Sequence, residues 1–359
     1  MQRKDCQSLF LQQAAQRGWL NGIEFFLLDV GASGGIDWFW NQFRPHLRAV
    51  GFDPLVSEVE RLNAEERDPK VSYEAAWIGD GTKHNFPDGC TSIFSCTSAQ
   101  RAITIKNINY AAKYYNRDQK LIYSDRMLRL DDFAEGAGFD DVDVVKIDTD
   151  CFDYFVLEGA RRLLTEGSVL LVECECQFHE LIGSPWPVFA DIDRFMREAG
   201  YRLVDLDPWH YTRAELPGRF KYDILAQTKS GQVNFCDALY MLDPSIDLSA
   251  RKRLGNNPAK LWKLATLLKT FGYPDLAAAT LLTMQKAGAT FPGLNIEEVL
   301  DMMVPANPFG AATYRDYMSV FERDPYQFYS SRWRESGLTA AFQTKSKPLF
   351  AKIKRALGL

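Results

Sequence analysis

The stretch Phe25-Phe-Leu-Leu-Asp-Val-Gly-Ala-Ser-Gly-Gly35 decides the fold of this 359-residue chain. Its apolar run, residues 25–28, predicts a buried parallel strand, and Asp29 follows where that strand should end. The three glycines of the stretch allow a sharp turn and let a ligand lie against bare backbone. We expect a helix to begin after this turn, with its N-terminal amides facing the ligand.

A second predicted strand, Leu47 to Phe52, ends in Asp53, where an acidic residue usually binds ribose hydroxyls. The glycine spacing lacks the second glycine of a dinucleotide fingerprint, which disfavours an NAD-dependent oxidoreductase. It suits S-adenosylmethionine better, because that cofactor has no phosphate and its cationic groups favour nearby carboxylates. The alternative is a glycine-rich turn that binds nothing. Residues after a third strand, 71–77, would flank the adenine. The predicted cofactor-binding residues are Asp29, Gly31, Ala32, Ser33, Gly34, Asp53, Ala76, Trp77 and Asp80.

Composition describes an ordinary globular protein of more than one domain. The formal net charge of −5 argues against general nucleic-acid binding. Seven cysteines without a secretory signal indicate reduced thiols in a cytoplasmic protein. No stretch is long and apolar enough for a transmembrane helix.

Strands alternate with helices along the first two thirds of the chain. This order predicts an α/β fold, a mostly parallel sheet with helices on both faces. The irregular residues 82–130 are either a substrate-binding element or a surface hairpin and helix. Further predicted strands are 142–148, 169–176, 201–206 and 222–228, and predicted helices are 55–66, 153–164 and 188–199.

The segment Val144-Val-Lys-Ile-Asp-Thr-Asp-Cys-Phe-Asp-Tyr-Phe-Val-Leu-Glu-Gly-Ala160 resembles the FkbM-type family of S-adenosylmethionine-dependent methyltransferases. Residues 29–32, 51–54, 130–133 and 171–173 resemble further landmarks of that family, in the same order. The family has Glu where this chain has Asp150, and Gly where it has Cys151. The resemblance implies a class I methyltransferase-like (Rossmann-type) fold and O-methylation, often of sugar hydroxyls.

Methyl transfer to a hydroxyl requires collinear donor and acceptor, exclusion of water and removal of the hydroxyl proton. For the base we predict His179 or Asp148 at the carboxyl ends of the strands, where ligands bind such sheets. The alternatives are a surface histidine and a helix-capping carboxylate. Lys146 would orient an acceptor oxygen or pair with a neighbouring carboxylate.

Carboxylates gather at the same predicted edge and could hold Mg²⁺ or Mn²⁺. Alternatively, they cap helices or face solvent. On one strand, Glu173 and Glu175 should point to one face, and Cys174 and Cys176 to the other. The predicted metal ligands are Asp148, Asp150, Glu173 and Glu175, with His179 just beyond.

The C-terminal third changes in character. Residues 259–270 and 274–286 predict a helical hairpin that packs on the sheet or on a second subunit. The last segment has five cations and no acid, and its apolar residues share one side of a helix. It predicts either an interfacial helix on an anionic membrane or a tail folded onto the protein. The predicted divisions are an N-terminal helix, 1–22; a methyltransferase domain, 23–242; a helical domain, 243–344; and a basic amphipathic tail, 345–359.

These observations favour a cytoplasmic O-methyltransferase that uses S-adenosylmethionine on a sugar hydroxyl of a glycan or glycolipid. If the tail binds lipid, the protein would lie on the inner face of the cytoplasmic membrane. The alternative is a catalytically silent relative that serves as an assembly or membrane-docking partner, and Cys151 keeps that alternative open.

Overall fold

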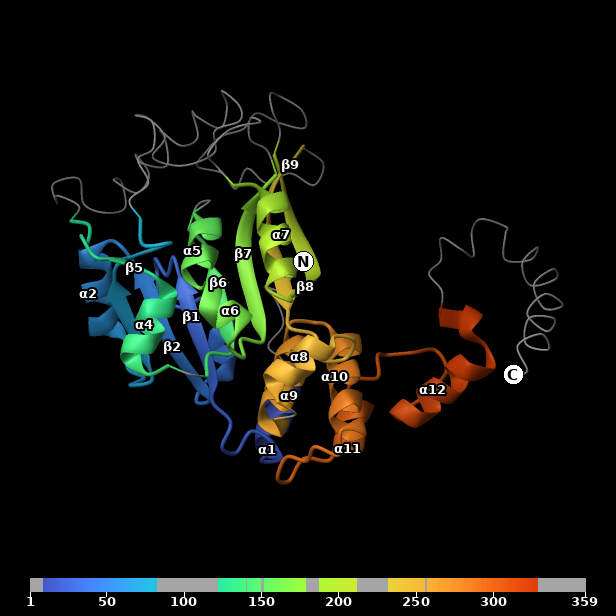
Figure 1. Cartoon of the computed structure of the whole chain (residues 1–359). Helices are drawn as coiled ribbons and strands as arrows, with labels where there is room; N and C mark the ends of the chain where they lie inside the picture. The colour runs from blue at the N-terminus through green and yellow to red at the C-terminus, as the bar shows by residue number, and fades with distance from the viewer. Residues whose placement is uncertain are drawn as a thin grey trace. The chain divides into compact units, whose positions relative to one another are not determined.

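A computed structural model of the chain describes residues 9–82, 122–139, 141–149, 152–178, 187–211, 232–255 and 257–328 (Figure 1). Two compact units make up the chain, residues 1–294 and 295–359. The first unit contains the sheet and the features that concern function.

A seven-stranded sheet forms the centre of the first unit, in the order β3-β2-β1-β6-β7-β9-β8. All neighbouring strands are parallel except β9, which runs antiparallel to both β7 and β8. All six residues of β1 are buried, as expected of a central strand covered on both faces. The strands are β1 (Phe25–Val30), β2 (Leu47–Asp53), β3 (Val71–Ala75), β6 (Val144–Ile147), β7 (Leu171–Gln177), β8 (Arg202–Tyr211) and β9 (Gln232–Met241).

Aromatic contacts show that helical segments cover both faces of the sheet. Phe25 packs against Phe43 of the 3₁₀ helix η2 (Trp38–Phe43), with ring centroids 5.0 Å apart. Its neighbour Phe26 packs against Phe139, just after α4 (Leu130–Ala137), at 4.9 Å. Because successive strand residues point to opposite faces, η2 and α4 lie on opposite sides. The remaining helices of this region are α2 (Val56–Glu65), α5 (Asp153–Gly159), α6 (Arg161–Thr165) and α7 (Phe189–Glu198).

The strand order and helical cover confirm the predicted class I methyltransferase-like fold. The order reverses between β1 and β6, and open α/β sheets bind their ligands at the carboxyl ends of the strands at such a point. The predicted strand 222–228 lies outside the described residues and stays a prediction. Strand β9, which was not predicted, pairs with β7. A short additional sheet pairs β4 (Trp77–Ile78) with β5 (Met127–Leu128).

The predicted helical hairpin is confirmed as α9 (Pro258–Thr270) and α10 (Pro274–Lys286), preceded by α8 (Leu248–Leu254). Asn257 caps α9, since its side chain accepts hydrogen bonds from the amides of Ala259 and Lys260. Trp262 of α9 is fully buried. Its ring centroid lies 6.4 Å from that of Trp19. The sequence prediction placed a domain boundary at residue 243, whereas contacts group residues 243–294 with the sheet.

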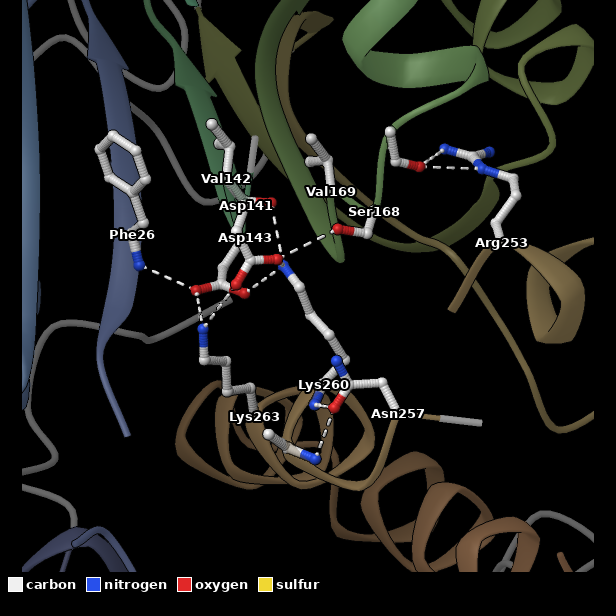
Figure 2. Close-up of polar contacts among 12 residues, drawn as sticks. Phe26, Asp141, Val142, Asp143, Ser168, Val169, Arg253, Asn257, Lys260 and Lys263 are labelled. Carbon is white, nitrogen blue, oxygen red and sulfur yellow. Dashed lines mark hydrogen bonds and ion pairs between the residues drawn. The ribbon is translucent and has the colours of Figure 1, made fainter. Parts of the chain in front are cut away.

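Buried charges connect α9 to the amino end of β6 (Figure 2). Asp143, which is 0% exposed, accepts hydrogen bonds from the amide of Phe26 at 2.9 Å and from the ammonium groups of Lys260 at 2.7 Å and Lys263 at 2.9 Å. Asp141 contacts the Lys260 ammonium at 2.7 Å but is 63% exposed. We call Asp141, Asp143, Lys260 and Lys263 the ionic clasp.

Arg253 of α8 attaches the same helical region to two helices that cover the sheet. Its guanidinium donates to the carbonyl oxygens of Leu164 at 2.6 Å, Gly167 at 2.8 Å and Ala199 at 2.9 Å. These carbonyls lie at the C-terminal ends of α6 and α7, where helices leave acceptors without intrahelical donors. A cation there also complements the helix dipoles.

The second unit contains α11 (Ile296–Asp301), α12 (Tyr314–Arg323) and the 3₁₀ helix η3 (Pro325–Phe328). Phe328 contacts the rings of Phe309, Tyr317 and Phe321, at centroid distances of 5.1–5.3 Å. The predicted basic tail, 345–359, lies outside the described residues. Among the helices that are described, none has the length and apolarity needed to cross a bilayer.

Candidate functional site

The glycine turn after β1 depends on the absence of side chains. Gly31, Gly34 and Gly35 have φ angles of +88°, +84° and +98°, which residues with a Cβ rarely adopt. A Cβ on Gly31 would lie 1.8 Å from the carbonyl oxygen of Asp148. The turn therefore brings bare backbone of β1 against the carboxyl end of β6. The amides of Gly31 and Ala32 also both donate to the carbonyl oxygen of Phe52 at 2.9 Å, which ties the turn to β2.

Glu58 of α2 holds the far end of this turn, a role that sequence analysis missed. Its carboxylate accepts from the amide of Gly34 at 3.0 Å and is 2% exposed. Hydrogen bonds from Arg61, at 2.6 and 2.9 Å, lower the pKa of Glu58 despite its burial. The sequence signal that could have indicated this role is the position of Glu58, an acid on the apolar side of the helix that follows β2.

The helix expected after the glycine turn is a short 3₁₀ helix, η2. The side chain of Asp37 caps it by accepting from the amide of Phe39 at 2.8 Å. Pro45 follows closely, and a proline cannot continue a helix. The predicted N-terminal amides of a full α-helix are therefore absent from the described residues at this position.

Asp29 is the central charge of the site. It is 1% exposed, and one carboxylate oxygen, Oδ1, lies 3.2 Å from the ammonium of Lys146. The other oxygen, Oδ2, is buried and accepts no hydrogen bond from any residue that the structure describes. Burial raises the pKa of Asp29 to about 6, and Lys146 opposes that increase. Since a buried acceptor without a donor is costly, this oxygen fits a cationic or hydrogen-bonding ligand.

Lys146 of β6 pairs in register with Asp29 of β1 on one side and with Glu173 of β7 on the other. Charges of alternating sign therefore cross three adjacent strands. Its ammonium also lies 3.6 Å from Oδ2 of Asp148. Burial alone would lower the pKa of Lys146, but the surrounding carboxylates outweigh burial and raise it above its ordinary range. The geometry favours the salt-bridge interpretation of Lys146, and a permanently protonated amine cannot act as a base.

Asp148 lies at the carboxyl end of β6 with 53% of its side chain exposed. The helix-capping alternative considered for Asp148 finds no support, because no side chain caps the start of α5, and the buried carboxylate beside it is that of Asp153. Asp153 accepts hydrogen bonds from the amide and hydroxyl of Thr149, at 3.3 and 2.8 Å, and from the amide of Glu175 at 2.8 Å. It is fully buried, and burial raises its pKa to about 7. Asp153 thus joins the carboxyl ends of β6 and β7, and Asp148 remains accessible to a ligand.

The predicted ribose and adenine positions lie around the ends of β2 and β3. Asp53 is largely buried, and its Oδ1 accepts from the amide of Leu55 at 2.7 Å. Burial raises the pKa of Asp53. Trp77 is 43% exposed and its ring lies 5.8 Å from that of Tyr123. Ala76 is buried, and Asp80 accepts from the amide and hydroxyl of Thr82, both at 2.8 Å. The structure brings these positions to one edge, and their contacts with a cofactor stay a prediction.

Other predicted site residues are only partly described. His179, Asp150 and Cys151 lie outside the described residues. Glu173 and Glu175 are half-buried on β7, and Cys174 and Cys176 are buried with sulfur atoms 3.8 Å apart, as the strand alternation predicts.

The predicted Mg²⁺ or Mn²⁺ site receives no support. The described part of the chain has no group of three or more metal-ligating side chains suited to a metal ion. The ammonium of Lys146 already supplies a positive charge to Asp29, Asp148 and Glu173. We therefore derive no step through a metal.

Comparison with known proteins agrees with this geometry. Residues 29–203 match the family model described as a methyltransferase FkbM domain. No curated protein sequence matches the chain significantly.

Solved structures give distant matches. A methyltransferase from Mesorhizobium loti is 13% identical with a TM-score of 0.30, covering 66% of this chain and 100% of that chain. A TehB-like methyltransferase from Corynebacterium glutamicum is 10% identical with a TM-score of 0.27, covering 65% and 88%. The N-methyltransferase NodS from Bradyrhizobium japonicum is 10% identical with a TM-score of 0.28, covering 64% and 84%. The family match includes Asp29, Lys146 and the glycine turn at Gly31, and residues 29–203 therefore form a methyltransferase domain of the FkbM type.

Proposed function

We propose that this protein transfers a methyl group from S-adenosylmethionine to a sugar hydroxyl of a glycan or lipid-linked glycan. The observation that carries the proposal is the buried, unsatisfied Oδ2 of Asp29 beside a glycine turn at the switch point of the sheet. A donor with a sulfonium and an ammonium group, and no phosphate, suits a buried carboxylate better than a dinucleotide does.

Four residues have separate roles in donor binding. Asp29 would hold the positively charged part of the donor, and Lys146 favours the ionised form of Asp29. Gly31 keeps the backbone free of a side chain, and Glu58 fixes the amide of Gly34. When bound, S-adenosylmethionine supplies an electrophilic methyl group. A turn held at both ends orients its ligand without further ordering, and this lowers the entropic cost of reaction.

For the acceptor, Asp148 is an exposed carboxylate at this edge, with its Oδ2 3.6 Å from the Lys146 ammonium that also contacts Asp29. We propose that it binds the acceptor hydroxyl and takes its proton during transfer, alone or with His179. A sugar acceptor rests on the FkbM-type domain, because that family implies methylation of sugar hydroxyls. A lipid-linked acceptor would also give the basic tail a role at the inner membrane face.

Calorimetric titration with S-adenosylhomocysteine and with NAD tests the donor. We expect binding of the former only, weakened at least about ten-fold by Asp29→Asn, because a charged hydrogen bond contributes on the order of 1.5–3 kcal/mol. The exposed Asp132 provides a control, since Asp132→Asn should leave affinity unchanged. Binding of NAD, or equal affinity of the Asp29→Asn variant, would overturn the proposal.

Methyl transfer itself needs a separate experiment. Incubation with labelled S-adenosylmethionine and glycan extracts, followed by mass spectrometry, should detect a methylated sugar that the Asp148→Asn variant forms more slowly. Donor binding without transfer to any acceptor would favour the catalytically silent assembly partner. Removal of residues 345–359 should reduce binding to anionic liposomes if the tail contacts a membrane.

A further inference from the structure

A cavity of about 300 Å³ lies at the amino ends of β1, β2 and β3. This edge of the sheet is opposite to the glycine turn, because the turn follows the carboxyl end of β1. The cavity is lined by Arg48 and Lys70 together with Glu24, Ser72 and Phe139. Its volume is at the lower end of the range found for small-ligand sites.

Two aromatic rings contact the guanidinium of Arg48 at this cavity. Its guanidinium carbon lies 4.3 Å from the ring centroid of Phe26 and 4.6 Å from that of Phe139. The two rings also contact each other edge to face, with centroids 4.9 Å apart and planes at 81°. Such contacts stabilise a cation and fix its orientation, but they leave its N–H donors without acceptors.

The guanidinium donors of Arg48 have no hydrogen-bond or ion-pair acceptor among the residues that the structure describes. This is unusual, because the side chain is half-buried rather than fully solvated. A nearby arginine shows the contrast: Arg44 donates to Glu66 and Asp68 at 3.0–3.1 Å. The planar fork of Arg48 is thus available for an acceptor from outside the chain.

The other charges of the cavity leave one positive charge in excess. Lys70 pairs with Glu24 at 2.9 Å, and these two formal charges cancel. Arg48 therefore gives the lining a formal charge of +1, within a chain whose total is −5. The exposed Ser72 adds a hydroxyl that can donate or accept, and Ala49 and Val50 supply apolar wall.

We propose that this cavity binds the oxyanion of a small molecule, a phosphate or carboxylate group, through the guanidinium of Arg48. An oxyanion matches the two-pronged donor geometry of arginine and neutralises the excess charge. Ser72 contributes a further hydrogen bond, and the apolar wall contacts the remainder of the ligand. This site is separate from donor binding and does not depend on the proposed methyl transfer.

Protection from chemical modification tests the site directly. Phenylglyoxal modifies accessible arginines, and mass spectrometry of the digested full chain reports each position. We expect millimolar inorganic phosphate to slow modification of Arg48 at least about five-fold while leaving Arg67 unaffected. Equal modification rates at Arg48 with and without phosphate or acetate would overturn the proposal.

Variants supply the second readout. Calorimetric titration with inorganic phosphate should show binding that Arg48→Met weakens at least about ten-fold, because a charge-assisted pair is lost. Arg67→Met changes the net charge equally from an exposed neighbouring position and should bind as the parent does. Arg48→Lys keeps the charge but loses the planar fork, and it tests the same point if Arg48→Met does not fold. Undiminished binding by Arg48→Lys and Arg48→Met would refute the assignment.

The source of the oxyanion is distinguished by two further probes. Binding of a hexose 6-phosphate, lost in Arg48→Met, would support a small soluble ligand. The opposite outcome is that the protein does not bind hexose phosphate but sediments with phosphatidylglycerol vesicles and not with phosphatidylcholine vesicles. If Arg48→Met also abolishes that sedimentation, the result would contradict a small-molecule ligand and assign the site to lipid phosphate.

Discussion

Replacement of Asp143 by alanine tests whether the ionic clasp holds the helical hairpin to the sheet. In the parent protein this buried carboxylate accepts from one backbone amide and from two ammonium groups, at 2.7–2.9 Å. The variant leaves the Phe26 amide without its acceptor. Lys263 keeps only the largely exposed Asp141, and Lys260 keeps Asp141 and the carbonyl oxygen of Val142 at 3.3 Å.

The expected loss follows from these contacts. A neutral hydrogen bond contributes about 1 kcal/mol and one to a charged group about 1.5–3 kcal/mol. Their sum is reduced by relaxation and by Asp141, so we expect Asp143→Ala to lower the free energy of unfolding by about 3–5 kcal/mol, the usual cost of breaking a buried pair. Asp141→Ala should cost less than about 1 kcal/mol, because its 63% exposed carboxylate is already partly screened by water.

Equilibrium urea denaturation measures both losses. Far-UV circular dichroism follows the whole unit, and tryptophan fluorescence includes the buried Trp262 of α9. A variant with Asp143→Leu, Lys260→Met and Lys263→Met should recover most of the loss, since it removes the buried charges together. A cost below about 1 kcal/mol for Asp143→Ala, or equal losses for Asp143→Ala and Asp141→Ala, would refute the reasoning.

Four further predictions concern the site and its supports. Gly31→Ala should lower thermal stability and donor affinity far more than Gly34→Ala. Both positions have positive φ, but only the Cβ at position 31 would collide with Asp148. Scanning calorimetry and calorimetric titration measure the two effects, and equal effects of the two substitutions would contradict this reasoning. Affinity for S-adenosylhomocysteine should be full above pH 6 and fall up to ten-fold per pH unit below it, because Asp29 is ionised only above its pKa of about 6. The Asp29→Asn variant should lose this pH dependence. The same pH profile in the variant as in the parent would contradict the prediction. Arg253→Ala should lower the free energy of unfolding, measured by urea denaturation, by about 2–4 kcal/mol, because it removes hydrogen-bond donors from the carbonyls at two helix ends. The neighbouring Lys252→Ala should be nearly neutral, and similar losses for the two variants would contradict the prediction. A chelator should leave donor binding unchanged, since Lys146 supplies the cation among the carboxylates, and loss of binding would restore the metal hypothesis.

Parts of the site could be predicted because their chemistry is local. Asp29 and the three glycines lie within one short stretch, and the strand-and-turn pattern places them at a sheet edge. Glu173 and Cys174 could be assigned to opposite faces because side chains alternate along any strand. Strand β9, which lies between β7 and β8, was missed. Its pairing partner β7 lies about sixty residues earlier in the sequence, and no local pattern indicates that pairing.

The sequence by itself determined the order of strands and helices from β1 to α7 apart from η2, α4 and the short strands β4 and β5, the glycine turn and the acids at the carboxyl ends, because periodicity and backbone freedom are properties of neighbouring residues. Only the tertiary structure decided which charges meet. Lys146 reaches Asp29 across 117 positions, and Lys260 and Lys263 reach Asp143 across 117 and 120. Burial, which raises the pKa of Asp29 and leaves its Oδ2 unsatisfied, likewise arises only when distant segments exclude water together.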